Sequence, residues 1–172
     1  MGRLLHTSKV KLHREPGKNK IKSAKFEGFP GTVRMSVHGG ISQFFGLNPA
    51  EPLPSTLDYL VAAIGGCMTG TVASVLEARE VSSAPENLSV DAEGRIEEVD
   101  GKMILTHVSL KYRIKVPKEK RESIDRALQH HESFCGVSES VRRGITVDWQ
   151  SEIEDDSASD RASASAVTAL KA

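Results

Sequence analysis

The sequence has little cysteine, few aromatic residues and no excess of charge of either sign. Only two of its 172 residues are cysteine, too few for the dense disulfide framework of a small secreted domain. Basic and acidic residues number 23 each, so the composition offers no dominant surface for nucleic acid or anionic lipid. The N-terminal segment lacks the apolar core of an export signal, and the apolar run from Leu60 to Met68 is short for a membrane span. We therefore expect a cytoplasmic protein that binds neither nucleic acid nor membranes.

The length suits one domain followed by a tail. Patterns typical of strands and helices succeed one another as far as residue 150. Beyond it the chain consists mainly of Ser, Ala and Asp without regularly spaced apolar residues. Such a segment buries too little apolar surface to offset the entropy lost on ordering. We expect a single domain over residues 1–150 and a flexible tail over residues 151–172.

The strongest periodicity lies between residues 55 and 79. Ser55 and Asp58 have the spacing of a capping box, which predicts the start of a helix. Gly65 and Gly66 interrupt this helix at roughly 1 kcal/mol each, so another backbone, a helix crossing or a substrate should approach closely there. Apolar residues recur at intervals of three and four and predict one broad buried face: Leu57, Leu60, Val61, Ile64, Met68, Val72, Val75 and Leu76.

The rest of the domain is predicted to contain antiparallel strands and shorter helices. Residues 39–54, rich in proline and glycine, predict an ordered loop. Even-numbered residues from Ile104 to Val116 are expected to share one face of a long strand. Pro117 should start a helix to His131, and a new cap at Ser133 a last helix that Gly144 ends. Alternation and turn residues predict the strands: 9–13, 32–37, 88–96, 104–116, with a hairpin turn at 99–102, and 145–149.

Both cysteines lie in apolar, helix-like segments. Cys67 follows the two glycines of the long helix, and Cys135 opens the sequence Cys-Gly-Val-Ser. Free cysteines often serve as small buried apolar residues, whereas two thiols that meet in the fold form a redox pair. A metal site would need the cysteines to join histidines such as His107, His130 and His131, but no Cys-x-x-Cys or His-x-x-x-His spacing is present. We expect no metal and no cofactor.

Two segments resemble the cysteine motifs of the OsmC/Ohr superfamily. Residues 54–67, Pro-Ser-Thr-Leu-Asp-Tyr-Leu-Val-Ala-Ala-Ile-Gly-Gly-Cys, are similar to its central-helix motif. Residues 131–138, His-Glu-Ser-Phe-Cys-Gly-Val-Ser, are similar to its second cysteine motif. The resemblance implies an α+β fold in which antiparallel sheets are wrapped around a central cysteine-bearing helix. It also implies an intertwined homodimer, in which the partner's loop around Phe44 and Phe45 shapes the pocket.

The same resemblance implies thiol-dependent reduction of organic hydroperoxides. Cys67 matches the peroxidatic cysteine and Cys135 the resolving cysteine, with an external dithiol as reductant. The alternative is a stress-response or binding protein of this family with little or no turnover. Ile41, Phe44, Phe45 and Met68 are candidates for an apolar wall of the substrate pocket.

The activation of Cys67 is expected to need a cation. Cys67 lies about three turns into its helix, too deep for the N-terminus of that helix to stabilise a thiolate. In the family an arginine from the N-terminal sheet, held by a glutamate, has this role. Arg34 is the candidate arginine, Asp58 stands at the glutamate position, and Glu51 is a substitute carboxylate.

Overall fold

The computed structural model describes residues 2–16, 20–49, 51–144 and 147. The described part of the chain begins with a small antiparallel sheet of three strands in the order β1-β2-β3. These strands are β1 (Val10–Arg14), β2 (Lys22–Phe26) and β3 (Val33–Met35). The strands predicted at residues 9–13 and 32–37 correspond to β1 and β3, whereas β2 was not predicted as a separate strand. Its Ser23 and Ala24 are buried, but the segment is too rich in lysine to show a clear apolar alternation.

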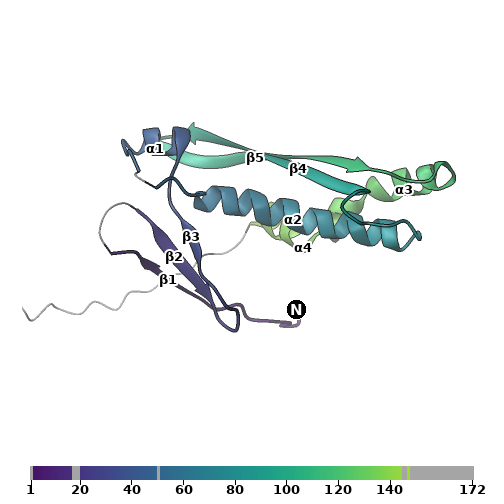
Figure 1. Cartoon of the computed structure of the whole chain (residues 1–172), viewed down its shortest axis with the longest axis horizontal. Coiled ribbons are helices and arrows are strands. Elements are labelled where there is room, and N and C mark those ends of the chain that lie inside the picture. The colour runs from purple at the N-terminus through teal and green to yellow at the C-terminus, as the bar shows by residue number, and fades with distance from the viewer. Residues whose placement is uncertain (1, 17–19, 50, 145–146, 148–172) are drawn as a thin grey trace, which may run out of the picture.

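A long helix and a long hairpin form the body of the molecule. The helix α2 (Thr56–Glu77) lies along the hairpin of β4 (Leu88–Val99) and β5 (Lys102–Ile114), as Figure 1 shows. Shorter elements complete the body: the 3-10 turn η1 (Lys118–Lys120), the helix α3 (Arg121–Leu128), the 3-10 turn η2 (His131–Phe134) and the helix α4 (Gly136–Arg143). The α+β class with antiparallel sheets is therefore confirmed.

The helix α2 begins as its sequence predicts. The Asp58 backbone N–H donates to the Ser55 hydroxyl at 3.2 Å, and the Ser55 backbone N–H donates to the Asp58 carboxylate at 2.6 Å. This capping box satisfies two backbone donors that a helix start would otherwise leave unpaired. Farther along, the apolar face of α2 enters a core with the hairpin and α3: Val72, Leu76, Val81, Leu88 and Ile124.

Glycines set how closely α2 approaches the hairpin. A Cβ atom added to Gly94 of β4 would lie only 2.4 Å from the Val61 side chain, and one added to Gly65 would lie 3.1 Å from the Ala92 Cβ. Gly65 is thus explained by the close approach of a sheet, one of the reasons that the sequence left open. Gly66 faces open space instead.

A β-bulge changes which residues of the hairpin face α2. The register shifts between Arg95 and Ile96, so that Arg95 pairs with His107 but Ile96 pairs with Leu105. Because side chains alternate along a strand, a shift of one residue reverses the faces. The prediction of one shared face is therefore wrong for Ile104, which is exposed, while Met103 and Leu105 are half-buried.

Three further elements differ from the sequence predictions. The predicted loop of residues 39–54 contains a short helix, α1 (Gly39–Phe44), whose Ile41 and Ser42 are buried. The single helix predicted from Pro117 to His131 is divided into η1 and α3, and η2 begins where the predicted helix was expected to end. Cys135, not Ser133, caps the last helix, because its sulfur accepts a hydrogen bond from the Ser138 backbone N–H. The strand predicted at 145–149 and the predicted tail lie outside the described residues, except Val147.

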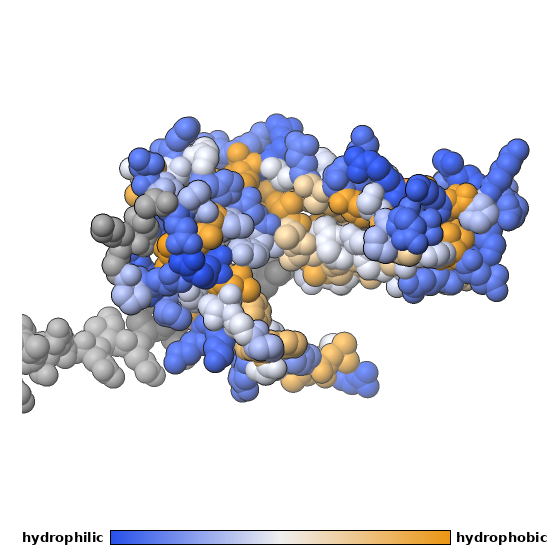
Figure 2. Space-filling view, viewed as in Figure 1, coloured by the Kyte–Doolittle hydropathy of each residue, from blue (hydrophilic) through white to orange (hydrophobic). Residues whose placement is uncertain are grey.

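The N-terminal sheet projects from the body beside the start of α2, as Figure 1 shows. In Figure 2 a cleft separates this sheet from the body. Apolar side chains of this part of the chain are exposed, among them Leu12 at 59% and Phe29 at 71%. The helix α2 as a whole is long and apolar enough to cross a membrane by length and composition alone, although the run from Leu60 to Met68 is too short by itself. Only 22% of the most apolar 18-residue window of α2 is buried. Much of the apolar surface of α2 is therefore left without cover by this one chain.

Candidate active site

The fold brings the two cysteines together. Cys67 lies in the middle of α2 and is partly exposed, and Cys135 caps the N-terminus of α4 and is 1% exposed. Both are free thiols, and the Cys135 side chain is hydrogen-bonded to the Cys67 sulfur. They meet because α4 and η2 both pack against α2. The structure therefore places at one point two thiols that lie far apart in the sequence.

The neighbours of the thiol pair favour a thiolate on Cys67. The hydrogen bond from Cys135 lowers the pKa of the Cys67 thiol, and the backbone N–H groups of Val137 and Gly136 lower it further, against a smaller effect of burial. Burial raises the pKa of the Cys135 thiol, and its bond to Cys67 acts in the same direction. The two environments thus assign the charge to Cys67 and the proton to Cys135.

The backbone N–H groups that favour a thiolate on Cys67 come from the N-terminus of α4, a helix that was not expected to have this role. We expected a cation because Cys67 is too deep in α2 for the N-terminus of α2 to reach it. The N-terminus of α4, however, points its first free N–H groups at the sulfur, a position in which a negative charge is favoured. The Cys-Gly-Val-Ser motif carried this signal, since a cysteine at the cap is followed directly by these N–H groups.

An open groove runs along α2 from Cys67. It has a volume of about 480 Å³ and ends at Arg79, whose guanidinium donates to the carbonyls of Val75 and Ser123. Phe134 of η2 also lines it. The other lining residues are small or moderately apolar: Gly70, Thr71, Ser74, Val75 and Ala78. A molecule with an apolar body can thus lie against α2 with its reactive end at the thiol.

Three of the four residues expected to form the apolar wall lie elsewhere in this chain, whereas Met68 follows Cys67 on α2 and is buried. Ile41 and Phe44 line a separate cavity of about 600 Å³ near the start of α2, together with His38 and Asp58. Phe45 packs edge-to-face on Phe44 at 5.1 Å between ring centroids. Within one chain, therefore, the wall beside Cys67 is not built from these aromatic residues, and a contribution from the partner's loop stays a prediction.

Arg34 lies in a cluster of charges on the N-terminal sheet. Its guanidinium donates to Glu15 through Nε at 2.7 Å and Nη2 at 2.8 Å, and to Glu51 through Nη1 at 2.5 Å and Nη2 at 3.0 Å. Arg34, then Ser23, lowers the pKa of Glu15 to about 2 by hydrogen bonding, and Arg34 likewise lowers the pKa of Glu51. The same bonds raise the pKa of Arg34. We call Arg34, Glu15 and Glu51 the arginine cluster.

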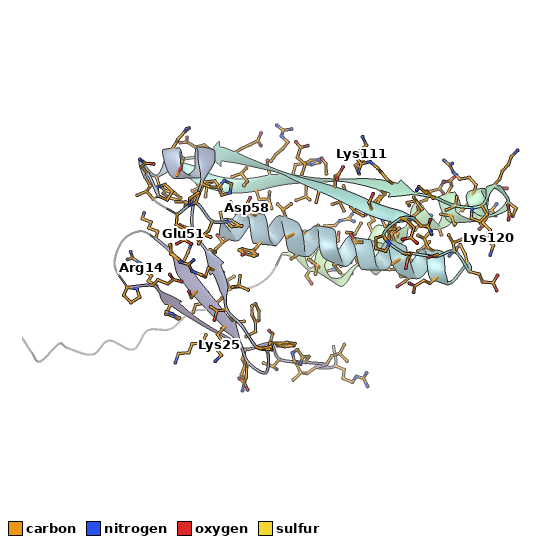
Figure 3. All side chains as sticks on the ribbon, in the orientation of Figure 1. Arg14, Lys25, Glu51, Asp58, Lys111 and Lys120 are labelled. Carbon is orange, nitrogen blue, oxygen red and sulfur yellow. The ribbon has the colours of Figure 1, made fainter. Side chains whose placement is uncertain are left out.

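The arginine cluster lies at the N-terminal end of α2. The Tyr59 hydroxyl donates to the Arg34 carbonyl at 3.0 Å, and Cys67 follows Tyr59 by roughly 12 Å along the helix axis at about 1.5 Å per residue. Figure 3 shows Glu51 and Asp58 at this same end. Among the described residues, the groups that shift the pKa of Cys67 belong to the second cysteine segment and do not include Arg34. Arg34 therefore does not activate Cys67 within one chain.

Asp58 and Glu51 have different roles. Asp58 closes the capping box and accepts a hydrogen bond from His38 Nε2 at 2.8 Å. Burial raises its pKa, but the bonds from Ser55 and His38 outweigh this effect and leave the pKa lowered. Glu51 and Glu15 are the carboxylates that hold Arg34. Glu51 was expected from the sequence as a substitute carboxylate, but Glu15 was not, because its place beside Pro16 gives no sign of its partner.

No group of three or more His, Cys, Asp or Glu residues in the described part of the chain is arranged to hold a metal ion. The histidines considered with the cysteines lie in different surroundings. His131 is bonded to Tyr112, and His107 lines a small cavity on the hairpin. The groups around Cys67 that lower the pKa of its thiol are the Cys135 thiol and backbone N–H donors.

The structure is that of an α+β protein with two neighbouring free thiols. Its family follows from comparison with known sequences. Residues 49–150, more than half of the chain, match the family described as OsmC-like protein, so the chain belongs to this family. No curated protein matches the sequence.

Solved structures share the fold at low sequence identity. An organic hydroperoxide resistance protein from Elizabethkingia anophelis is 18% identical, with a TM-score of 0.58 over 85% of this chain and 95% of that one. An OsmC-like protein of unknown function from Vibrio cholerae is 14% identical, with a TM-score of 0.57 over 80% and 93%. An OsmC-like protein from Mycoplasma pneumoniae is 14% identical, with a TM-score of 0.55 over 83% and 91%. These likenesses establish the fold.

Proposed function

We propose that this protein reduces organic hydroperoxides with Cys67 as the nucleophile and Cys135 as the resolving thiol. The observation that carries the proposal is the environment of Cys67, where the Cys135 thiol and two backbone N–H groups favour the thiolate. The thiolate is the reactive form of cysteine, and a partly exposed thiolate beside an open groove is accessible to a substrate. The name of the structural relative from Elizabethkingia anophelis agrees with this chemistry.

The reaction consists of peroxide reduction by Cys67, disulfide formation with Cys135, and reduction of the disulfide by an external dithiol. The Cys67 thiolate attacks the distal oxygen of the hydroperoxide, the O–O bond breaks, and the leaving alkoxide takes a proton to give the alcohol. Cys67 is then a sulfenic acid. The Cys135 sulfur attacks the Cys67 sulfur, the S–O bond breaks, and water leaves with the Cys135 proton. An external dithiol restores both thiols by exchange and becomes a disulfide itself, which suits a reducing compartment such as the cytoplasm.

A second copy of the chain completes the site in this proposal. One chain leaves much of the apolar window of α2 and the apolar residues of the N-terminal sheet exposed. It also holds the arginine cluster away from its own Cys67. An intertwined two-fold dimer covers the apolar surface, and its symmetry gives each subunit's sheet access to the α2 helix of the other. The arginine cluster of one subunit then stands near Cys67 of its partner, where Arg34 adds a positive charge.

A second candidate function follows from the same separation. If the arginine cluster only fastens the N-terminal sheet to α2, the protein is a stress-response or binding member of the family with little turnover. Four hydrogen bonds occupy the Arg34 guanidinium and favour this view. The two functions differ in the reactivity of the Cys67 thiol in the assembled protein.

The decisive experiment measures hydroperoxide consumption with a dithiol reductant. We expect the wild type to consume cumene hydroperoxide faster than hydrogen peroxide, because the groove beside Cys67 accepts an apolar body. Cys67→Ser should abolish consumption, since an alcohol at this position does not ionise near neutral pH. Unchanged consumption by Cys67→Ser would exclude the mechanism. A wild type that consumes neither peroxide would leave the second candidate function.

A further inference from the structure

A hydrogen-bonded pair of side chains lies beside Cys135. The Tyr112 hydroxyl of β5 is 3.1 Å from Nε2 of His131 in η2, and the two rings pack edge-to-face with centroids 5.4 Å apart. The other ring nitrogen, Nδ1, lies 2.5 Å from the Leu128 carbonyl oxygen. A carbonyl only accepts hydrogen bonds, so Nδ1 carries the proton and Nε2 accepts from the Tyr112 hydroxyl. The tautomer of His131 is therefore fixed by both partners.

The Tyr112–His131 pair connects β5 of the hairpin to η2, the turn directly before Cys135. The η2 turn ends directly before Cys135, whose backbone N–H donates to the Glu132 carbonyl at 3.1 Å. Burial raises the pKa of Tyr112 to about 12, and the acidic groups of Cys135 and Glu132 act in the same direction, so the phenol keeps its proton. The ring of Tyr112 also packs against the buried core. β5 therefore provides a fixed anchor for an otherwise short, irregular segment.

We propose that Tyr112 and His131 are positioning residues that hold η2 so that the Cys135 sulfur stays aimed at Cys67. The proposal rests on the proposed function, because it concerns the step in which Cys135 resolves the oxidised Cys67. Cys135 is almost fully buried and has no freedom to search for its target. A disulfide also needs the two sulfurs to approach to about 2.05 Å with a restricted dihedral angle. Small displacements of the turn should slow bond formation while leaving the attack of Cys67 on peroxide unchanged.

The test separates the two steps of the reaction in the full-length protein. Tyr112→Phe removes the hydroxyl and keeps the ring, and His131→Ala breaks the same bond from the other side. After a pulse of cumene hydroperoxide, quenched samples are analysed by intact mass for the sulfenic acid, trapped with dimedone, and for the disulfide. We expect sulfenic acid to form at the wild-type rate in both variants. Disulfide should form about fivefold more slowly in Tyr112→Phe, the effect of losing one hydrogen bond, and at least as slowly in His131→Ala, which also loses the bond to the Leu128 carbonyl. Ser109→Ala, an exposed hydroxyl on the same strand, serves as the control.

Two further comparisons make the outcome decisive. The double variant Tyr112→Phe/His131→Ala should be no slower than His131→Ala, because the bond that Tyr112→Phe removes is already absent in His131→Ala. A loss of fold stability alone would lower the melting temperature without changing the ratio of the two rates. Wild-type rates of disulfide formation in both single variants, or effects that multiply in the double variant, would overturn the proposal.

A second oxidant distinguishes this inference from the proposed function. Diamide needs no peroxidase activity: the Cys67 thiolate adds to its N=N bond, and Cys135 then attacks the Cys67 sulfur and displaces the hydrazine, which takes the proton. If the wild type forms the disulfide with diamide but not with hydroperoxide, the proposed function fails. The positioning role is then judged by diamide alone, where Tyr112→Phe should again slow disulfide formation about fivefold.

Discussion

The two ends of α2 are held to the rest of the chain by different forces. From Met68 onward the helix is packed against the hairpin and α3, and Val72 and Leu76 are fully buried. At its start the contacts are polar: the capping box, the His38–Asp58 pair and the arginine cluster, whose side chains are between 28% and 50% exposed. Apolar packing fixes positions tightly, whereas exposed ion pairs contribute little stability each and tolerate rearrangement.

This difference matches what each end has to do in the proposed reaction. Two sulfurs that must form a bond need a dry and well-packed frame, and the thiol pair lies where α4 and η2 pack on α2. The arginine cluster needs only to present charge, and it lies on the sheet that projects from the body. Substitutions in the packed part should therefore lower both the stability of the fold and the reactivity of the thiol pair. Substitutions at the polar end should mainly affect dimer formation and the positive charge supplied by Arg34.

The largest loss of stability is expected from Leu76→Ala, which leaves a cavity in the packed core around α2. Leu76 is fully buried in the core. Its truncation should lower the free energy of unfolding by about 2–5 kcal/mol through lost burial and the cavity left behind. Urea denaturation measures the change.

The matched control for this variant is Leu12→Ala in the N-terminal sheet. Leu12 is 59% exposed in one chain, so its truncation should cost at most a few tenths of a kcal/mol if nothing covers it. A cost above about 1 kcal/mol would show that a second copy buries Leu12 and would extend the packed region across a subunit interface. Equal losses from the two leucines in a monomer would contradict the comparison itself.

The second effect concerns the acidity of Cys67. Cys135→Ala removes the hydrogen bond that most lowers the pKa of the Cys67 thiol, so this pKa should rise and the thiolate fraction at neutral pH should fall. We expect alkylation by iodoacetamide near pH 7 to slow roughly fivefold to tenfold. Cys135→Ser keeps a donor and should slow it less. Identical pH profiles for wild type and Cys135→Ala would show that the backbone N–H groups of α4 act alone.

A smaller effect should appear in the acid stability of the polar end. The pKa of Glu15 is lowered to about 2 by Arg34 and Ser23, so its ion pair stabilises the fold above the ordinary pKa near 4.5. This contribution is lost as the pH falls from about 4.5 to about 2, where the carboxylate takes up a proton in the folded state. Arg34→Gln should weaken this part of the acid dependence of the melting temperature. Unchanged profiles in the variant would mean that Ser23 and solvent alone hold the Glu15 charge.

The sequence predicted the parts of the fold that are encoded locally. The capping box and apolar spacing of α2 and the Asp100–Gly101 turn, where both residues have positive φ, depend on nearby residues only. The β-bulge at Arg95 and Ile96 was not predictable, because no local signal marks one extra residue in an alternating strand. The helix α1 was hidden by the glycines at its start, Gly39 and Gly40, and by Gly46 just beyond its end.

The candidate site shows the same limit. The family motifs indicated that Cys67 and Cys135 form a pair, and the structure places them in contact, but their roles stay predictions until tested. The dipole of α4, the carboxylate of Glu15 and the Tyr112–His131 bond all depend on elements that meet only in the fold. Long-range pairs of single residues leave no periodic trace in the sequence.

The smallest effect is expected from removing residues 152–172. The match to the OsmC-like family ends at residue 150, and the removed segment has few apolar residues and no regular spacing between them. Most of its apolar residues are alanine, so it offers little large apolar surface to the packed core. Sedimentation equilibrium at low micromolar concentration should give the same dimer for the shortened and the full chain, with equal rates of cumene hydroperoxide consumption. A monomeric shortened chain would instead place part of the cover of α2 in this segment, and a compact, active monomer of the full chain would refute the shared site.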